Sequence, residues 1–268
     1  MTPYDPESPA TSHQPPAASN QQPATSDQPP AAPNEKRETR NEKPFWNYLD
    51  LGFFISLLLP ALFVAALLVK AMSPILPFGK PFQALLSQLI AYVLIFTSLY
   101  LLLHLRYGQP FWRSLGWTFP IAAVTASFLA GPLLAITIGL IGNILQTPEI
   151  PLPFQKMLDN RPTVVLFAIF VVVLGPLCEE LAFRGFLMPL LVRSFGPATG
   201  IIATGFLFGS LHGPEYGWHW QHALLISVAG MVFGWVRYRT GSTAAAVAMH
   251  STYNLTQFAA FLVQNRTI

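Results

Sequence analysis

Two adjacent carboxylates lie inside a long apolar stretch of this chain. Glu179 and Glu180 occur in VVVLGPLCEELAFRGFLMPLL, and Arg184 follows Glu180 by four residues. A charged side chain at the centre of a bilayer costs at least about 2.5–3.5 kcal/mol, so such residues usually serve a function. Arg184 can pair with Glu180 on one helix face, but Glu179 points about 100° away and has no partner on its own helix. Two neighbouring carboxylates in a low dielectric do not both ionise easily, and a poised carboxyl suits a general base or acid.

Two further polar sites follow on apolar segments. Phe208 and His212 share one helix face at i,i+4, and so do His250 and Asn254. A lone histidine in such a position is more often a packing residue than a functional one. Here, however, two such pairs follow an intramembrane carboxylate pair. We therefore ask whether all of these residues belong to one site.

The depths of these residues agree. A hairpin turn is expected near Gly196, with Glu179 about 16 residues before it and His212 about 16 after it. At about 1.5 Å per residue both lie about 24 Å from that turn, on neighbouring antiparallel helices. His250 follows a second turn near Gly241 and can reach the same layer to within a turn or so. We therefore expect carboxylates, imidazoles and an amide to converge inside one helix bundle.

The composition requires a membrane body behind a polar tail. Of the 268 residues 52% are hydrophobic and 10% charged, against about 25% charged in ordinary soluble domains. Residues 1–43 hold nine of the 25 prolines and ten of the 27 charges, which leaves about 8% charge in the remainder. A water-soluble domain and, with one cysteine, a disulfide scaffold are excluded. The pI near 9.1 rests on a surplus of three charges, so no nucleic-acid partner is expected.

The tail over residues 1–43 is rich in Pro, Gln and Ser and predicts a disordered segment, because it has almost nothing to bury. Apolar runs long enough to cross about 30 Å of hydrocarbon lie at about 51–71, 82–104, 119–145, 163–193, 197–213, 220–238 and 242–263. The fold class is therefore an all-α polytopic membrane helix bundle of seven helices, or eight if the fourth run breaks. Alternate loops collect nine and five Lys or Arg, which predicts a cytoplasmic tail on a multi-pass protein of the cell membrane.

Other residues near these motifs have simpler interpretations. His219 and His222 lie in a polar aromatic loop that could cover the site, although the same composition is typical of an ordinary loop at the membrane interface. Cys178 is interpreted as a packing residue, because a buried thiol beside carboxylates is not activated. Pro176 lacks an N–H and so removes a backbone bond to Val172, which could bend the helix at the site.

The three motifs together resemble the signature of the type II CAAX prenyl protease family, the CPBP or Abi group of intramembrane peptidases. They are Glu179-Glu180-x-x-x-Arg184, Phe208-x-x-x-His212 and His250-x-x-x-Asn254, in this order on successive apolar segments. The resemblance covers about the last hundred residues. It divides the chain into the tail (1–43), N-terminal transmembrane helices (44–162) and a CPBP/Abi-like catalytic core (163–263).

The resemblance implies a membrane endopeptidase that cleaves a membrane-associated peptide, either a prenylated CAAX-type C-terminus or a bacteriocin-like peptide. In one mechanism Glu179 activates a water, His212 positions it, and His250 and Asn254 donate to the oxyanion, with Glu180 and Arg184 as support. In the other, Glu179, His212 and His250 bind Zn²⁺, and the second carboxylate is the base. The absence of His-Glu-x-x-His favours the metal-free version, and the absence of Gly-x-Ser-x-Gly argues against a serine hydrolase.

Two other functions fit the same residues. A non-catalytic immunity or scaffold protein of the family would use the polar cluster only for binding. A proton-coupled transporter would use the carboxylate pair as its protonation site, but the two halves of the chain show no inverted repeat. The substrate, the need for a prenyl group and the oligomeric state do not follow from the sequence.

Overall fold

A computed structural model describes residues 44–75, 79–150 and 161–265, and over these ranges the protein is helical without β-strands. The predicted disordered tail lies outside the described residues. The elements are α2 (Tyr48–Ser56), α3 (Leu58–Met72), α4 (Lys80–Leu101), η1 (Leu102–Arg106), α5 (Phe111–Ser114), α6 (Ile121–Ile144), α7 (Arg161–Ile169), η3 (Phe170–Leu174), α8 (Gly175–Glu180), η4 (Leu181–Leu187), α9 (Met188–Phe195), α10 (Pro197–Leu211), α11 (Trp220–Thr240) and α12 (Thr243–Asn265), where η marks a π-helix.

Several of these helices are long and apolar enough to cross a membrane. Four qualify within the described residues, at Tyr48–Met72, Phe82–Arg106, Ile121–Ile144 and Thr163–Phe195. Large apolar side chains point outward from them, such as Leu59 (77% exposed) and Leu133 (66% exposed), as a lipid-facing surface requires. The protein is therefore an all-helical membrane protein with several apolar helices.

The other three expected spans are present as α10, α11 and α12. Within the described residues α10 is shorter than a span requires, and neither α11 nor α12 qualifies as a span by length and hydropathy. The fourth run stays helical from Thr163 to Phe195 rather than breaking into two helices. The number of membrane crossings and the side of the tail remain predictions.

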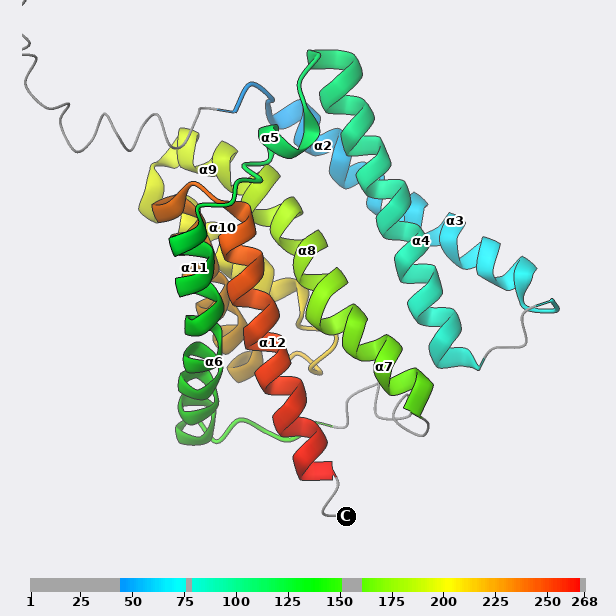
Figure 1. The fold of residues 1–268 in the computed structure, drawn as a ribbon. Helices are drawn as coiled ribbons and strands as arrows, with labels where there is room; N and C mark the ends of the chain where they lie inside the picture. Colours follow the sequence, from blue (N-terminus) through cyan, green and yellow to red (C-terminus); the bar gives the residue numbers. More distant parts are fainter. Residues whose placement is uncertain (1–43, 76–78, 151–160, 266–268) are drawn as a thin grey trace, which may run out of the picture.

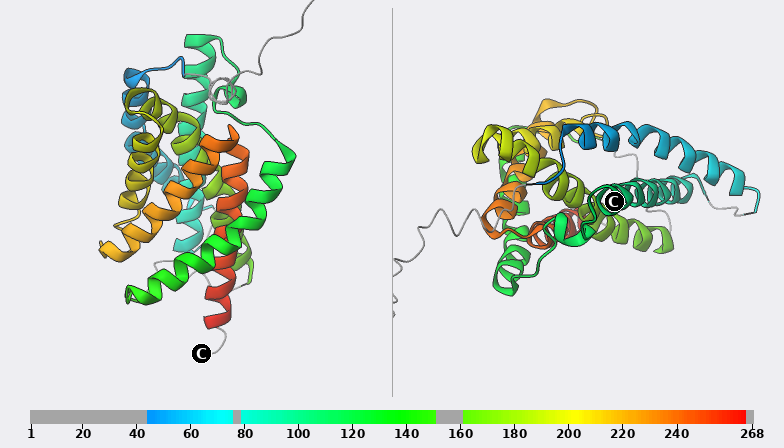
Figure 2. Two further views of the ribbon diagram at one scale, coloured as in Figure 1. Left: turned by 90° about the vertical axis from the view of Figure 1, so that its left-hand side faces the viewer. Right: turned by 90° about the horizontal axis from the view of Figure 1, so that it is seen from above.

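The helices form a bundle from which one pair projects. Figures 1 and 2 show α6 and α8–α12 packed together, while α3 and α4 extend to one side. The closest neighbours within the bundle are α6 with α12 and α10 with α11. The three motifs lie on α8 and η4, on α10 with His212 just after its end, and on α12, which are thus all part of the bundle.

Both predicted hairpin turns are confirmed. α9 ends at Phe195, and α10 begins after Gly196, whose φ of 81° is open to glycine at little cost. α11 ends at Thr240, and Gly241 follows with φ 68° in the left-handed conformation that terminates many helices. The first turn reverses the chain between α9 and α10, and the second reverses it between α11 and α12.

The start of the described chain is fixed to the motif-bearing helix. Trp46 donates its indole N–H to the carbonyl of Phe186 at 3.1 Å, and the two rings stack with centroids 5.4 Å apart. Nearby, buried Asp50 accepts from the hydroxyl of Tyr107 and pairs with Arg106 at 2.7 Å. α2, η1 and η4 are thereby tied together at one end of the bundle.

Candidate active site

The helical stretch that carries the carboxylate pair departs from α-helical register before it reaches them. The N–H of Gly175 donates to the carbonyl of Phe170, five residues earlier, which closes the π-helix η3. The expectation that Pro176 removes a bond to Val172 assumed α-helical register. If the π register of Gly175 is continued by one residue, the N–H that Pro176 lacks would reach the carbonyl of Val171 instead.

Glu180 is fully buried and holds two partners with one oxygen. Its Oε1 accepts from Arg184 Nη1 at 2.8 Å, which forms the predicted i,i+4 pair, and from His250 Nδ1 at 2.9 Å. Because the carboxylate accepts at Nδ1, that nitrogen carries the proton and the second ring nitrogen of His250 is left for other partners. Glu180 thus joins α8 to α12.

Arg184 is also fully buried, and its guanidinium lies among aromatic rings. Its Nη2 donates to the carbonyl of Gly230 on α11 at 2.7 Å. Its Cζ lies 4.6 Å from the ring centroid of Phe208 and 5.5 Å from that of Phe233. This explains Phe208 in the second motif, because a ring face stabilises a cation that has lost its water.

Glu179 and His212 face the same space as His250. Glu179 Oε2 lies 3.8 Å from His250 Nε2, and the Glu179 side chain is 27% exposed, whereas that of His250 is 4% exposed. His212 Nδ1 lies 2.7 Å from the carbonyl of Phe208, so Nδ1 is the donor and Nε2 is directed elsewhere. Glu179, unlike Glu180, has no close partner on its own helix in the described structure.

Asn254 lines the same space but already uses part of its amide. Its Nδ2 donates to the carbonyl of Val171 at 2.9 Å, so it spans from α12 to η3. One helical turn before Asn254, the ring of His250 stacks on Phe233 with centroids 4.5 Å apart. This contact fixes the plane of the imidazole.

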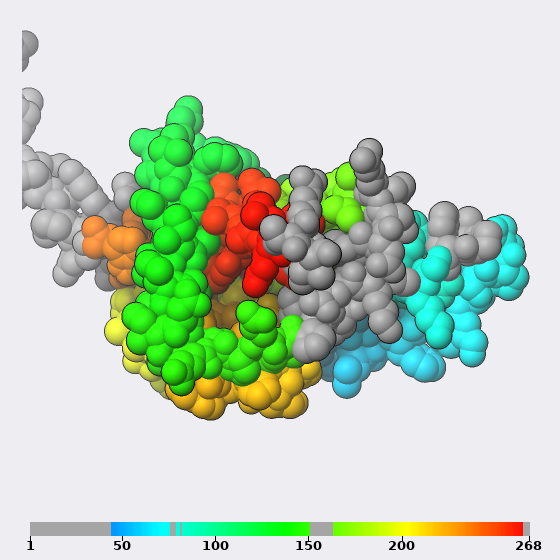
Figure 3. Space-filling view, turned by 90° about the horizontal axis from the view of Figure 1, so that it is seen from below, coloured from blue at the N-terminus to red at the C-terminus, as the bar shows by residue number. Residues whose placement is uncertain are grey.

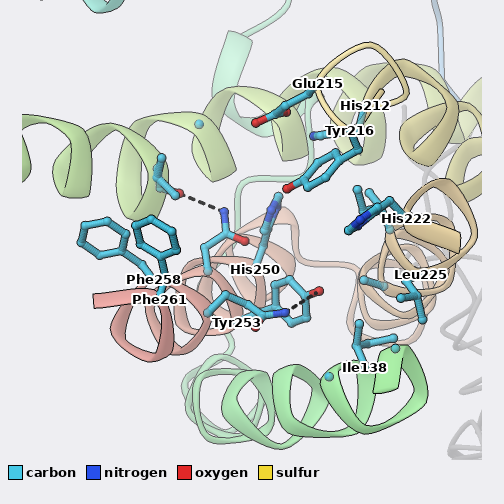
Figure 4. Close-up of a pocket in the computed structure, with 18 of the residues that line it drawn as sticks. Ile138, His212, Glu215, Tyr216, His222, Leu225, His250, Tyr253, Phe258 and Phe261 are labelled. Atoms are coloured by element: carbon cyan, nitrogen blue, oxygen red, sulfur yellow. Dashed lines mark hydrogen bonds between the residues drawn. The ribbon is translucent and has the colours of Figure 1, made fainter. Parts of the chain in front are cut away.

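These side chains border one cavity of about 930 Å³. Figure 4 shows His250 near its centre, Glu215 and Tyr216 projecting into it from the connection after α10, and Phe258 and Phe261 bordering it from α12. One end is therefore polar and the other is aromatic and apolar. Figure 3 shows the lower face of the molecule, with α6 and α12 side by side.

Glu215 lines the cavity, and the sequence analysis did not single it out. It lies three residues after His212, close enough for that imidazole to favour its charged form. Partial removal from water raises the pKa of its carboxyl, His212 opposes this shift, and Glu179 adds a smaller upward shift. Its spacing of one helical turn from His212 was the signal that could have identified it.

The two histidines of the polar loop have different surroundings in the structure. His222 Nε2 lies 3.0 Å from the carbonyl of Pro148, its ring stacks on Tyr216 with centroids 4.6 Å apart, and it lines the cavity. His219 is exposed at the start of α11. Only His222 is thus placed to influence what enters the cavity.

A Zn²⁺ site would need three of these side chains to direct ligand atoms at one point. Within the described residues no group of three or more His, Cys, Asp or Glu side chains has that arrangement. His250 Nδ1 is bonded to Glu180, and His212 Nδ1 to a backbone carbonyl, so each histidine could offer a metal only Nε2. The side chains as placed do not fit a three-ligand Zn²⁺ site.

Fold and site together define a polytopic helical membrane protein with a buried glutamate and histidine cluster beside a large cavity. Residues 161–256 match the family model described as type II CAAX prenyl endopeptidase Rce1-like, which confirms the resemblance deduced from the three motifs. The matched segment contains all three motifs. No curated protein and no solved structure matches the chain.

Proposed function

We propose that this protein is an intramembrane endopeptidase that hydrolyses a peptide bond with a water activated by Glu179. The observation that carries the proposal is that Glu179, His212 and His250 border one cavity, while Glu180 and Arg184 lie fully buried behind them. Families with an Rce1-like domain are generally proteases, which agrees with this arrangement.

The reaction follows from the free atoms of the site. Glu179 takes a proton from water as the water oxygen attacks the carbonyl carbon of the scissile bond. His212, through the Nε2 left free by its bond to Phe208, orients that water. The resulting tetrahedral oxyanion accepts a hydrogen bond from His250, and Glu179 then returns its proton to the leaving amine as the C–N bond breaks.

Glu180 prepares His250 for this role. The Nδ1–H of His250 is bonded to the Glu180 carboxylate at 2.9 Å, which fixes the orientation of the ring. With Nδ1–H held by Glu180, His250 donates to the oxyanion through Nε2 in its imidazolium form. Arg184 balances the negative charge of Glu180 and is itself fixed by Gly230 and the ring of Phe208. Glu180 and Arg184 thus support the reaction without touching the substrate.

The substrate we propose is a membrane-associated peptide that places its scissile bond at the polar end of the cavity. The aromatic end, bordered by Phe167, Phe258 and Phe261, then takes an apolar group of that peptide. The Rce1-like domain favours a prenylated CAAX-type C-terminus over a bacteriocin-like peptide.

The test uses the purified full chain in lipid vesicles with a prenylated CAAX peptide and with the same peptide lacking the prenyl group. Mass spectrometry is expected to show a single cleaved bond that gains one water, and Glu179→Ala, His212→Ala and His250→Ala are each expected to abolish cleavage while the protein remains folded. Turnover that persists in Glu179→Ala would contradict the proposal.

The same assay with a metal chelator separates the two mechanisms. The proposed reaction keeps its rate, whereas a Zn²⁺ enzyme loses activity and regains it when zinc is restored. A folded wild-type protein that cleaves neither peptide would favour the binding or scaffold function.

A further inference from the structure

A carbonyl in the helix of Glu179 has lost its backbone donor to a proline. Gly175 donates to Phe170 in π-helical register, and the next N–H in that register would belong to residue 176 and reach Val171. Pro176 has no N–H. An unsatisfied carbonyl inside a membrane protein is costly, so Val171 needs a donor from elsewhere.

Asn254 supplies that donor from another helix. Its Nδ2 lies 2.9 Å from the carbonyl oxygen of Val171. Four residues earlier on the same helix, His250 bonds Glu180 at 2.9 Å. α12 therefore holds the Glu179 helix at two points, one on each side of the turn formed by Gly175 and Pro176.

Glu179 follows this turn closely enough to move with it. A Cβ placed on Gly175 would lie 3.8 Å from Glu179 Oε1 and 3.2 Å from the carbonyl of Phe170, so the carboxylate lies directly beside the π-helical bulge. If the helix changed from π- to α-helical register at this bulge, Glu179 would rotate about the helix axis and shift along it. His250 would stay in place on α12, so the distance between the two side chains would change.

We propose that Asn254 is a positioning residue whose amide replaces the N–H missing from Pro176 and thereby sets the place of the Glu179 carboxylate. The inference rests on the proposed function and deepens it. The Nδ2 of Asn254 carries two hydrogens, and we assign the one bonded to Val171 to the positioning of Glu179. This role is distinct from the oxyanion contact that the family resemblance implies for Asn254. The oxyanion is then served by His250.

Asn254→Ala is expected to lower kcat about 10- to 100-fold while KM changes less than threefold, since displacing a catalytic group by about 1 Å costs up to about 100-fold. Leu255→Ala is the matched control, because Leu255 is the next residue on α12 and faces outward, 49% exposed. Rates are compared per folded enzyme, which removes any effect of a merely structural role.

Pro176→Ala provides the decisive background, because alanine restores an N–H that can donate to Val171. When Pro176→Ala is already present, Asn254→Ala is expected to lower kcat less than threefold. If Asn254→Ala lowers kcat equally with and without Pro176→Ala, Asn254 acts on the substrate directly and the inference is overturned. If Asn254→Ala lowers kcat less than threefold in the chain that keeps Pro176, the inference is overturned as well.

A second measurement does not depend on the folding of Pro176→Ala. A peptide phosphonate that mimics the tetrahedral intermediate is expected to bind Asn254→Ala within threefold of its affinity for the wild type, because His250 stays in place. An affinity that falls in proportion to kcat would assign the amide to the oxyanion and overturn the inference. If the wild type itself shows no Glu179-dependent cleavage, the proposed function fails and this inference fails with it, which is a distinct result.

Discussion

Replacement of Arg184 by methionine tests how the buried charges are held. The guanidinium is fully buried and makes two short contacts, 2.8 Å to Glu180 Oε1 and 2.7 Å to the carbonyl of Gly230. Methionine fills much of the same space but supplies no charge or donor. It leaves Glu180 as a buried carboxylate with only His250 as a partner.

Breaking a buried ion pair by removing one partner costs about 3–5 kcal/mol. For a protein of this size about 1 kcal/mol corresponds to roughly 2–4 °C, so Arg184→Met is expected to lower Tm by about 6–20 °C. The assay is thermal unfolding of the purified protein in detergent, followed by tryptophan fluorescence. Arg239→Met is the matched control, because Arg239 is exposed and lies over Trp235, with its Cζ 5.5 Å from the ring centroid.

Addition of Glu180→Gln to Arg184→Met should recover part of the loss. The glutamine is neutral, and its carbonyl can still accept from His250 Nδ1, so no charge is left unpaired in the interior. A Tm of Arg184→Met within 1 °C of the wild type would refute the reasoning. So would a double variant as unstable as the single one.

Three further predictions concern residues outside the catalytic cluster. Burial raises the pKa of Glu215, so its stabilising contribution is complete below about pH 4 and is lost as the pH rises through the raised value. Glu215→Gln should therefore melt increasingly above the wild type from pH 4 to pH 8, and a constant difference would contradict this cause. Gly209→Ala should cost about 1–3 kcal/mol, because its Cβ would press on Ala223 and Ser227 of α11, whereas Gly52→Ala meets nothing within 4 Å and should not destabilise in the same unfolding assay. Trp46→Phe should cost about 0.5–1.5 kcal/mol by losing the bond to Phe186, and an unchanged Tm would contradict that role.

The helical fold could be predicted because its signals are local and strong. Long apolar runs predicted helices, and the glycines at 196 and 241 marked the hairpin turns that the structure contains. The count of crossings was harder to predict. The sequence analysis read apolar runs at 220–238 and 242–263 as spans, but α11 and α12 carry polar residues toward the cavity and do not qualify as spans by their hydropathy.

The candidate site was predictable where spacing alone determined the geometry. Equal distances from one turn placed Glu179 and His212 at one depth, and both now border the same cavity. The bonds of Glu180 to His250 and of Asn254 to Val171 could not be predicted, because they depend on how α12 rotates against α8 and η3. The π-helical register before Pro176 was missed for a related reason, since a sequence pattern does not reveal a single inserted residue in a helix.

The central claim is that Glu179 activates the water, and its isosteric replacement tests this most directly. Glutamine keeps the size of the side chain and leaves the buried pair of Glu180 and Arg184 intact. In lipid vesicles with a prenylated CAAX peptide, Glu179→Gln is expected to lower kcat/KM by about 10²- to 10⁴-fold with an unchanged Tm, as the loss of a general base requires. A folded Glu179→Gln protein that cleaves within threefold of the wild-type rate would contradict the account.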